Sequence, residues 1–568
     1  MLRKPFRSLY WMFLAAVPAL LRADLTADQK EFDMRALAAH YAKHYAPYEW
    51  KIELFRFDLL ELRPWISRAR ASRDDLEFYE ICAEYVTSLR DTHSSFILPT
   101  NFSASLGLSI DIYDGKPLVD AVNRTLLPLS RFPVVAGWEV VSVDGVPAET
   151  LIDRFSRFVS SGNAVSRRRT AANYLGFRPQ SRIPRAHEIG DAAEVVFLDR
   201  DGQEVTLTIP WTKQGTPLTS AGRLPSPPFR TAAARAPAAG AAGEEDITPP
   251  YLAPLAELRN ERVEPAGEVL NYGSRFPVWA YPAGYQQRVG ASASDPLVSG
   301  SFPAQGLRIG LIRIPNFSPP PGAAAALRVW DAEIAWMQEN TDGLIVDVMR
   351  NNGGDACYNE EIQRRLIPYE FRGLGREIRV TTRWVNSFAS ALLLARQSNA
   401  PPHVIAQLER NLEEVQRTFA ENRGRSGPLP ICAETLTRQP APGAYTKPVM
   451  VLVDPYSTSA ADGFAAALQD AGRGPLFGMR TNGAGGTTGN FPTGLFSESL
   501  ASHTTAMHHR RQPVVTPDYP TANYVENIGV RPDIQYDIMT RENLLDAGRP
   551  FVRAFTEAMV EHIQRSQP

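Results

Sequence analysis

The stretch Leu307-Arg-Ile-Gly-Leu-Ile-Arg-Ile314, followed by residues 323–340 and by Gly343-Leu-Ile-Val-Asp-Val-Met349, decides the fold. The first and third segments have the apolar, β-branched composition of buried strands, and the segment between them has the spacing of an amphipathic helix. A strand, a helix and a strand in this order form a right-handed βαβ unit in nearly all known proteins. We therefore expect an α/β core over residues 251–568, interrupted by a charged helical insertion at about 388–425.

Two further units precede this core. Residues 24–100 carry apolar side chains at three- and four-residue intervals, which predicts a helical segment. Residues 101–212 instead alternate apolar and polar residues in short runs, with a hairpin turn at Asp201-Gly202, which predicts a compact β-rich module. Residues 213–250 are rich in Pro, Ala, Gly and Ser and lack large apolar side chains, so we expect a disordered linker there.

The N-terminus has the organisation of a secretory signal peptide, which we place at residues 1–23. A basic head, Met1-Leu-Arg-Lys-Pro-Phe-Arg7, precedes an apolar run, and Ala23 ends that run ahead of a polar, acidic sequence. The alternative is a membrane anchor, but about a dozen apolar residues fall short of the roughly 20 that cross a bilayer. We expect cleavage after Ala23, a mature protein without a transmembrane span, and a periplasmic or extracellular location.

Composition excludes several classes of function. The formal net charge of -2 provides no basic field for nucleic acid. The nine histidines show no metal-ligand spacing such as HExxH, so we expect no metal, and we expect His508 and His509 to lie at the surface. Three cysteines, Cys82, Cys357 and Cys432, are too few for a disulfide scaffold, and spacing leaves open whether Cys357 bonds to Cys432.

The strongest candidate for a nucleophile is a serine that follows a predicted strand. Residues 449–454 run into Pro455-Tyr-Ser-Thr-Ser459 and then into a helix that ends at Gly472. A serine at such a junction lies beside free backbone N–H groups and the positive end of the helix dipole, which suits formation of an oxyanion. The alternative is structural, because Ser459 and Asp462 have the spacing of a helix capping box. Local sequence alone favours the cap.

Four separated blocks of sequence change that balance. They are Leu89-Arg-Asp-Thr-His93, Gly343 to Gly354, Ser457-Thr-Ser-Ala-Ala-Asp-Gly-Phe464 and Val525-Glu-Asn-Ile-Gly-Val530. Together, and in this order, they resemble the core blocks of the tail-specific processing proteases and the tricorn core. The resemblance implies a ClpP/crotonase-like α/β core and a serine endopeptidase that acts on protein or peptide substrates through an acyl-enzyme, without a cofactor, with recognition of substrate C-termini as an option.

One departure from the family pattern indicates the subtype. In tail-specific proteases a Thr-x-Gly-Lys-Gly segment supplies a lysine base, whereas Thr481-Asn-Gly-Ala-Gly-Gly486 has Ala484 in the place of the lysine. A serine without a base is a poor nucleophile. The tricorn-like branch uses the histidine of a Thr/Ser-His motif, so the resemblance implies that His93 is the base; an imidazole suits proton transfer in both directions near neutral pH.

The same resemblance assigns the remaining catalytic groups. Glu526 would be the acid that completes a Ser-His-Ser-Glu arrangement, and Thr92 would supply the second hydroxyl. The backbone N–H groups of Gly353 or Gly354 and of Ala460 would hold the oxyanion, since glycine lets the backbone approach a reacting carbonyl closely. The structural alternatives are a solvated carboxylate, an ordinary turn threonine and a simple pair of loop glycines.

The β-rich module resembles the PDZ-like domain of this family through Leu106-Gly-Leu-Ser109 and Gly137-Trp-Glu-Val-Val-Ser-Val143. Such a domain can add a peptide as an extra strand and hold its terminal carboxylate on backbone N–H groups, which makes Leu106, Gly107 and Leu108 candidate peptide-binding residues. A structural lid is the alternative for this module. For the whole chain the rival is a non-catalytic protein that binds peptides or apolar ligands, because the same fold occurs in a retinoid-carrying relative.

Overall fold

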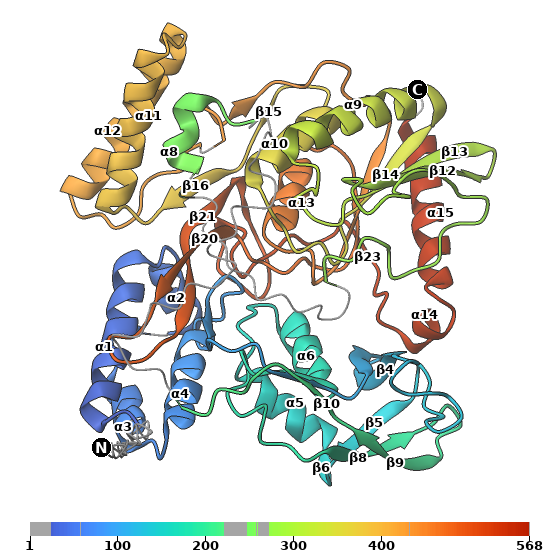
Figure 1. Cartoon of the computed structure of the whole chain (residues 1–568). Helices are drawn as coiled ribbons and strands as arrows, with labels where there is room; N and C mark the ends of the chain where they lie inside the picture. The colour runs from blue at the N-terminus through green and yellow to red at the C-terminus, as the bar shows by residue number, and fades with distance from the viewer. Residues whose placement is uncertain are drawn as a thin grey trace, which may run out of the picture.

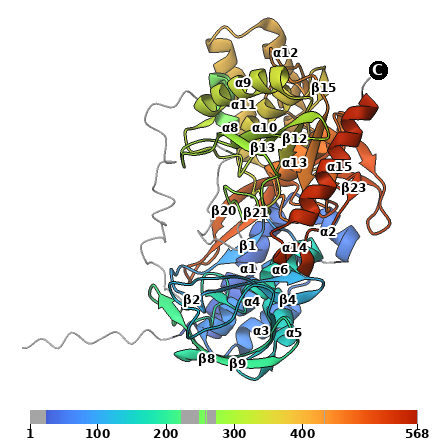
Figure 2. The ribbon, with the colours of Figure 1, turned by 90° about the vertical axis from the view of Figure 1, so that its right-hand side faces the viewer.

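The computed structural model describes most of the chain, in residues 24–56, 58–220, 247–256, 258, 272–430 and 432–566. The predicted signal peptide at 1–23 lies outside the described residues, and so does the part of the predicted linker at 221–246. Figures 1 and 2 show an α/β core above, with the N-terminal helices and the β-rich module below it.

A seven-stranded sheet forms the centre of the core, in the order β11-β12-β13-β14-β18-β19-β23. The predicted βαβ unit is present as β13 (Leu307–Arg313), α9 (Ala323–Asn340) and β14 (Gly343–Asp347), and its two strands pair in parallel. The other strands of the sheet are β11 (Gln286–Val289), β12 (Val298–Ala304), β18 (Val449–Val453), β19 (Leu476–Gly478) and β23 (Ile534–Gln535). The strands from β13 to β23 are parallel, so the predicted α/β class is confirmed.

Helices cover both faces of this sheet, which explains why its strands read as unbroken apolar runs. Leu344 and Val346 of β14 pack in one cluster with residues of α9, α10 (Ala356–Leu366) and α13 (Ala460–Asp470). Ile345, which points to the opposite face, packs in another cluster with α15 (Arg549–Ser566). In Figure 1, α15 stands at the right, apart from α9, α10 and α13.

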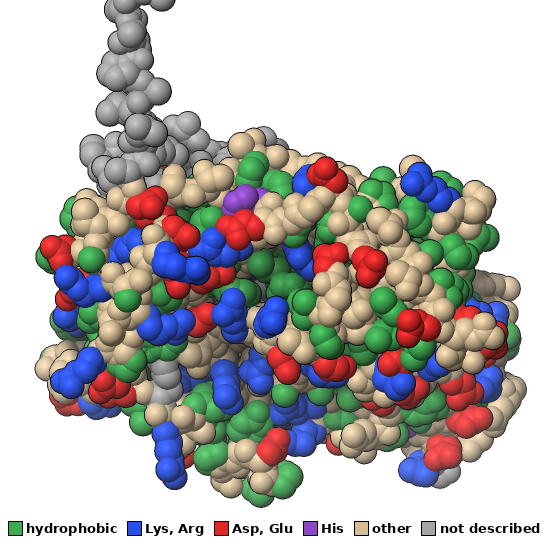
Figure 3. All heavy atoms as spheres, turned by 90° about the horizontal axis from the view of Figure 1, so that it is seen from below, with side chains coloured by type: hydrophobic (Ala, Val, Ile, Leu, Met, Phe, Trp, Pro, Cys, Tyr) green, Lys and Arg blue, Asp and Glu red, His purple; other side chains and the backbone are tan. Residues whose placement is uncertain are grey.

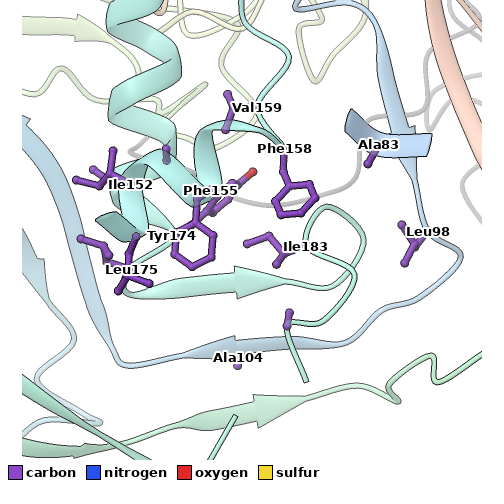
Figure 4. Close-up of a cluster of buried hydrophobic side chains, with 14 of the residues drawn as sticks. Ala83, Leu98, Ala104, Ile152, Phe155, Phe158, Val159, Tyr174, Leu175 and Ile183 are labelled. Atoms are coloured by element: carbon purple, nitrogen blue, oxygen red, sulfur yellow. The ribbon is translucent and has the colours of Figure 1, made fainter. Parts of the chain in front are cut away.

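The N-terminal helices and the β-rich module share one hydrophobic core. Figure 4 shows Phe155, Tyr174 and Ile183 of the module in the same cluster as Ala83 and Leu98 of the N-terminal segment. The helices of the N-terminal segment are α1 (Ala27–His44), α2 (Tyr48–Phe55), α3 (Arg63–Ala71) and α4 (Asp75–Thr87). The module contains β2 (Ser103–Ser105), β3 (Leu108–Tyr113), β4 (Lys116–Val122), β5 (Glu139–Val143), β6 (Val146–Pro147), α5 (Ala148–Ser156), α6 (Ala164–Asn173), β7 (Phe177–Pro179), β8 (Ala192–Leu198), β9 (Glu204–Pro210) and β10 (Thr212–Gln214).

A second sheet ties the N-terminal segment to the core. Its long strand, β21 (Leu500–Val514), pairs with β1 (Ser95–Ile97), with Ser95 opposite Ser502. The same strand also pairs with β16 (Gly375–Ile378), β20 (Gly486–Pro492) and β22 (Ala522–Tyr524). In Figure 2, β20 and β21 lie between the two halves of the molecule. The chain around His93 is therefore anchored to the core by backbone pairing.

The predicted helical insertion is a hairpin of α11 (Thr382–Gln397) and α12 (Pro402–Ala420), which projects at the upper left of Figure 1. A disulfide joins Cys357, in the first turn of α10, to Cys432, and Cys82 is a buried free cysteine. The remaining elements are α8 (Ala253–Ala256), β15 (Phe371–Arg372), β17 (Thr437–Arg438), α14 (Arg541–Leu545) and a short 3₁₀ turn, Pro250–Leu252.

On the face seen in Figure 3, basic and acidic side chains are interspersed. Within the described ranges, no helix has the length and apolar character to cross a membrane. The same residues contain no group of three or more His, Cys, Asp or Glu placed to hold a metal ion.

Candidate active site

Ser459 lies at the junction of β18 and α13 in a strained conformation. Its backbone has φ 59° and ψ -112°, whereas an ordinary helix N-cap has extended backbone angles. Positive φ is uncommon for residues other than glycine, and such strain concentrates at functional sites. Ser459 is largely buried, and 9% of the residue's surface is exposed to solvent. Ser459 and Asp462 thus form the capping box that their spacing allowed, but Ser459 has a positive φ that an ordinary cap does not have.

Asp462, one turn into α13, holds this geometry in place. Its Oδ2 accepts the N–H groups of Ser459 at 2.9 Å and Ala484 at 3.0 Å. Its Oδ1 accepts the N–H of Gly483 at 2.8 Å and the hydroxyl of Thr481 at 2.5 Å. Burial raises the pKa of Asp462 to about 6, although these four donors oppose the rise. One carboxylate thus binds the nucleophile turn to the loop in which Ala484 stands in the place of the family's lysine.

Gly353, one of the two predicted oxyanion glycines, lies directly against Ser459. A Cβ built on Gly353 would come within 2.6 Å of the Cβ of Ser459 and 3.0 Å of the N–H nitrogen of Ala460. Gly353 has φ 89° and Gly354 has φ 139°, so both need glycine. The N–H of Gly353 donates to Asn351 Oδ1 at 2.8 Å, and a Cβ built on Gly354 would lie 2.4 Å from the carbonyl carbon of Phe317 rather than against Ser459.

Ala460 is the first residue of α13, so its N–H is one of the four that a helix does not satisfy internally. Its carbonyl accepts the Asn359 side-chain amide at 2.9 Å, which fixes the peptide. The N–H of Ala460 therefore lies beside Ser459 and Gly353, as one donor of an oxyanion hole would, whereas the second donor is assigned only by the resemblance.

His93 is buried and its backbone is held by two side chains. Its N–H donates to Asp91 Oδ1 at 2.8 Å, and its carbonyl accepts the hydroxyl of Ser502 on β21 at 2.7 Å. The second oxygen of Asp91 accepts the hydroxyls of Ser94 and Thr504. Burial would raise the pKa of Asp91, but Lys51 and His93 outweigh this and keep that pKa below its ordinary value. The ionised Asp91 carboxylate thus lies against the backbone of His93.

Thr92 connects this segment to the nucleophile turn. Its hydroxyl donates to Asn482 Oδ1 at 2.6 Å. The backbone N–H of Asn482 donates to the carbonyl of Ser457 at 3.0 Å, two residues before Ser459. The segment with His93 and the turn with Ser459 are thus separated by one bridging residue, although 366 positions of sequence lie between the two residues.

Glu526 lies in a buried ion pair. One carboxylate oxygen accepts Lys51 Nζ at 2.5 Å and the other accepts the N–H of Gly485 at 3.1 Å. Both charged side chains are fully buried. Burial and repulsion by Asp91 raise the pKa of Glu526 to about 8, and Lys51 opposes the rise. The expected solvated alternative for Glu526 is therefore wrong.

The prediction that His508 lies at the surface is also wrong. His508 is buried in β21, and its Cε1 lies 3.7 Å from where a Cβ of Gly463 would stand, one turn beyond Ser459. Burial, with Arg376 and His93 nearby, lowers the pKa of His508 well below its ordinary value. A neutral, buried His508 thus lies close to both His93 and α13. The prediction failed because β21 is flanked by strands on both sides, which the sequence does not reveal.

The three candidate peptide-binding residues lie in the β-rich module, and two of their N–H groups are already engaged there. Leu106 donates to the carbonyl of Gly176 at 2.8 Å, and Gly107 donates to Ser105 Oγ at 3.0 Å. Leu108 pairs with Val122 at the start of β3. In this conformation the loop 106–108 supports its own fold rather than offering donors to a carboxylate.

The module nevertheless touches the nucleophile turn. Ser166 of α6 donates its hydroxyl to the carbonyl of Pro455 at 2.5 Å. The hydroxyls of Thr170 and Tyr456 lie 3.0 Å apart, and the Arg169 guanidinium lies over the Tyr456 ring at 4.5 Å from its centroid. A movement of α6 would therefore be felt three residues from Ser459.

Sequence and structure comparisons identify several proteins that resemble this chain. Residues 308–536 match the family model of Peptidase family S41. A Chlamydia pneumoniae protein is 22% identical over 575 residues, which cover 91% of this chain and 88% of the relative, and a Chlamydia trachomatis protein is 26% identical over 260 residues, or 40% of each chain. Two solved structures of mature CPAF, one complexed with lactacystin, are 19% identical and cover 95% of this chain and 99% of theirs, with TM-scores of 0.74 and 0.73. They share the fold of this chain.

Proposed function

We propose that this chain is a serine endopeptidase with Ser459 as its nucleophile and His93 as its base, since residues 308–536 match the model of Peptidase family S41 and the sequence blocks resemble those of tail-specific proteases. The observation that carries the proposal is the contact of Gly353 with a strained Ser459. Gly353 has no side chain to cover Ser459 or the N–H of Ala460, as an oxyanion site beside this hydroxyl would require. Protein or peptide chains are the substrates that this arrangement fits.

The reaction would follow the general course of serine hydrolases. His93 takes the proton of Ser459 as the hydroxyl oxygen bonds to the peptide carbonyl carbon, and the oxyanion is held by the N–H groups of Ala460 and Gly354. The tetrahedral intermediate collapses, the C–N bond breaks, and His93 protonates the leaving amine. Water then attacks the acyl-enzyme with His93 again as base, which releases the acid and restores the hydroxyl.

The surrounding groups support His93 in this role. Asp91 holds the backbone of His93 and lies near enough to stabilise the imidazolium that forms when Ser459 loses its proton. Glu526 contributes a second carboxyl behind the site, and Thr92 fixes the distance between the two segments through Asn482. Ala484, which replaces the lysine, is fully buried and donates its N–H to Asp462, so the loop that carries it has a structural task in this chain.

We further propose that the protein is exported, from the signal-peptide pattern of residues 1–23. Recognition of substrate C-termini by residues 106–108 would require the N–H groups of Leu106 and Gly107 to leave their present acceptors. Binding of a substrate C-terminus would thus require the module to rearrange. Cleavage at an internal bond of a substrate would not require this rearrangement.

The test of this function is digestion of an unfolded protein. The mature chain, from residue 24, should fragment reduced, denatured casein at internal bonds near neutral pH, whereas Ser459→Ala and His93→Ala should leave it intact at the same protein concentration. Circular dichroism of both variants checks that they are folded. Casein that remains intact with the folded wild-type chain, or fragmentation that continues with Ser459→Ala, would contradict the proposal.

A further inference from the structure

Lys51 of α2 is fully buried, and each of its three N–H donors has an acceptor. Its Nζ lies 2.5 Å from Glu526 Oε1, 2.6 Å from Asn527 Oδ1 and 3.1 Å from the carbonyl oxygen of Arg90. A lysine is rarely fully buried, because the desolvation of an ammonium is costly unless paired and hydrogen-bonded partners offset it. The buried Lys51 ammonium therefore has a role beyond packing.

Two of the three acceptors belong to residues with strained backbones. Arg90 has φ 49° and Asn527 has φ 63°, both in the left-handed region that residues other than glycine rarely adopt. The Asn527 side-chain amide also donates to the carbonyl of Arg90 at 2.8 Å. Lys51 and Asn527 together thus fix one turn that enters Asp91 and His93 and another that leaves Glu526.

We propose that Lys51 is a positioning residue for the serine peptidase proposed above, whose ammonium locks the turn before His93 to the turn after Glu526 and so holds His93 in line with Ser459. The inference rests on that proposed function. Lys51 does not act on the substrate, because its three donors are occupied by these turns.

Neutralising Glu526 would not by itself require this arrangement. A cation that served only to balance the carboxylate would need one contact, yet two of the three contacts of Lys51 go to uncharged carbonyl oxygens of Arg90 and Asn527. Through Lys51, those two bonds link Arg90 to Asn527, which lie 437 positions apart in the sequence. The structure therefore separates two roles that can be measured independently, charge balance and positioning.

The experiment measures inactivation of the mature chain by a fluorophosphonate, as the maximal rate constant kinact and the half-saturating concentration KI. Lys51→Met should lower kinact about tenfold to a hundredfold with KI nearly unchanged, since misplacement of a catalytic group by about 1 Å costs up to about a hundredfold in rate. Lys30→Met is the matched control. Lys30 is also a buried lysine of the N-terminal helices, bound to the carbonyls of Ser72 and Asp74, and its loss should lower thermal stability without changing kinact.

A double variant separates positioning from charge balance. Lys51→Met/Glu526→Gln buries no charge from this pair, so it should fold at least as well as Lys51→Met, yet its kinact should remain at least tenfold below that of Glu526→Gln alone. Equal kinact in those two variants would overturn the inference, because Lys51 would then act only by neutralising Glu526. A higher KI for Lys51→Met with unchanged kinact would also overturn the inference, because Lys51 would then affect binding of the probe and not the reaction. A folded wild type that is not labelled at all would instead overturn the proposed function.

Discussion

At Ser459 the chain holds a non-glycine residue at positive φ, which costs about 1–3 kcal/mol and persists only where neighbours enforce it. Asp462 enforces it from one side by accepting the N–H of Ser459, and Gly353 leaves space for it on the other. Asp462 and Gly353 thus fix the position of the Ser459 hydroxyl, although neither has a role in the proposed reaction. Substitution of either residue tests this support.

Replacement of Gly353 by alanine should abolish activity while the chain still folds. The added Cβ would lie 2.6 Å from the Cβ of Ser459, so the nucleophile or the loop must move. Gly202→Ala is the matched control, because Gly202 has a similar φ of 80° in the turn between β8 and β9 but no atom within 4 Å of the added Cβ. Both variants should lose about 1 kcal/mol of stability from backbone strain. Casein digestion should fall more than a hundredfold in Gly353→Ala and stay at the wild-type rate in Gly202→Ala.

Asp462→Asn should change the pH dependence of stability in a defined direction. The pKa of Asp462 is raised in the folded chain to about 6 from an ordinary 3.8. Folding therefore favours the protonated form, and this contribution is complete below about 3.8 and is lost as the pH rises through about 6. The excess of the wild-type Tm over that of Asp462→Asn should shrink between pH 4 and 6 and be constant from pH 6 to 8, by differential scanning fluorimetry. An excess that grows from pH 4 to 6 would mean that the four donors outweigh burial and that the pKa is lowered.

The sequence allowed the reacting residues to be proposed but not their supports. Ser459, His93, Gly353 and Gly354 stand in motifs whose order along the chain carries the resemblance. Lys51 lies in an ordinary helical segment, and its partners are 39 to 476 positions away, so no local pattern marks it as buried. Asp91 and Asp462 lie inside the motifs, yet their acceptor roles depend on tertiary contacts.

At the scale of elements, the loop with Gly353 and Gly354 leads directly into α10, and the disulfide Cys357–Cys432 secures the first turn of that helix. Asp355 caps the same turn by accepting the N–H groups of Cys357 and Tyr358. The bond closes a loop of 75 residues that includes the hairpin of α11 and α12. The position of the oxyanion loop thus depends on a covalent link to the insertion.

Loss of the disulfide should weaken both stability and reactivity. Cys357→Ser/Cys432→Ser should destabilise the fold by about 2–4 kcal/mol, because the unfolded chain gains the freedom of the opened loop. Fluorophosphonate labelling of Ser459 should slow several-fold, since Gly354 is three residues before Cys357. Cys82→Ala, which removes the free cysteine, is the control and should leave the labelling rate unchanged. Unchanged Tm and labelling in the double variant would contradict a role for the bond.

The elements were predictable where one periodicity covers a whole segment. The apolar run at 343–349 and the amphipathic spacing at 323–340 indicated β14 and α9, and the turn at Asp201-Gly202 indicated the β8–β9 hairpin. The second sheet was not predicted, because β21 joins β1, β16, β20 and β22 from distant parts of the chain. His508 was misplaced for the same reason, since only that pairing buries it.

At the scale of the whole molecule, the site is assembled from all three units. The N-terminal segment brings Lys51 and His93, the core brings Ser459 and Glu526, and the β-rich module braces the nucleophile turn. Beside this contact, Asp111 of the module accepts two hydrogen bonds from the Arg169 guanidinium, at 2.8 and 2.7 Å. The Asp111 carboxylate also lies 3.6 Å from the guanidinium of Arg350, which follows β14 in the core. All three side chains are buried.

Asp111→Asn should therefore loosen the module from the core. It removes the ionised carboxylate that accepts both hydrogen bonds of the buried Arg169 guanidinium, and the loss of one partner of a buried pair costs about 3–5 kcal/mol. We expect Tm to fall by several degrees and casein digestion to slow. Glu149→Gln is the control, because Glu149 pairs with Arg168 at the exposed surface of the same module, where a pair is worth at most about 1 kcal/mol. Equal effects of the two substitutions would show that the buried contact does not hold the units together.

The assembly of the three units could be inferred only through the resemblance. Each unit has its own periodicity and composition, and from these the sequence predicts a division at about residues 100 and 250. The continuous core that joins Ala83 and Leu98 to the module, and the burial of Arg169 beside Asp111, rest on side chains that meet only in the folded chain.

The most direct test of the central claim is fluorophosphonate labelling of the mature chain, with mass spectrometry of the labelled peptide. We expect one adduct, on Ser459, in the wild type. It should be absent from Ser459→Ala and from His93→Ala, each of which must be shown to be folded. An adduct that survives His93→Ala would mean that another group is the base. A folded wild type without any adduct on Ser459 would contradict the assignment of this chain as a serine peptidase.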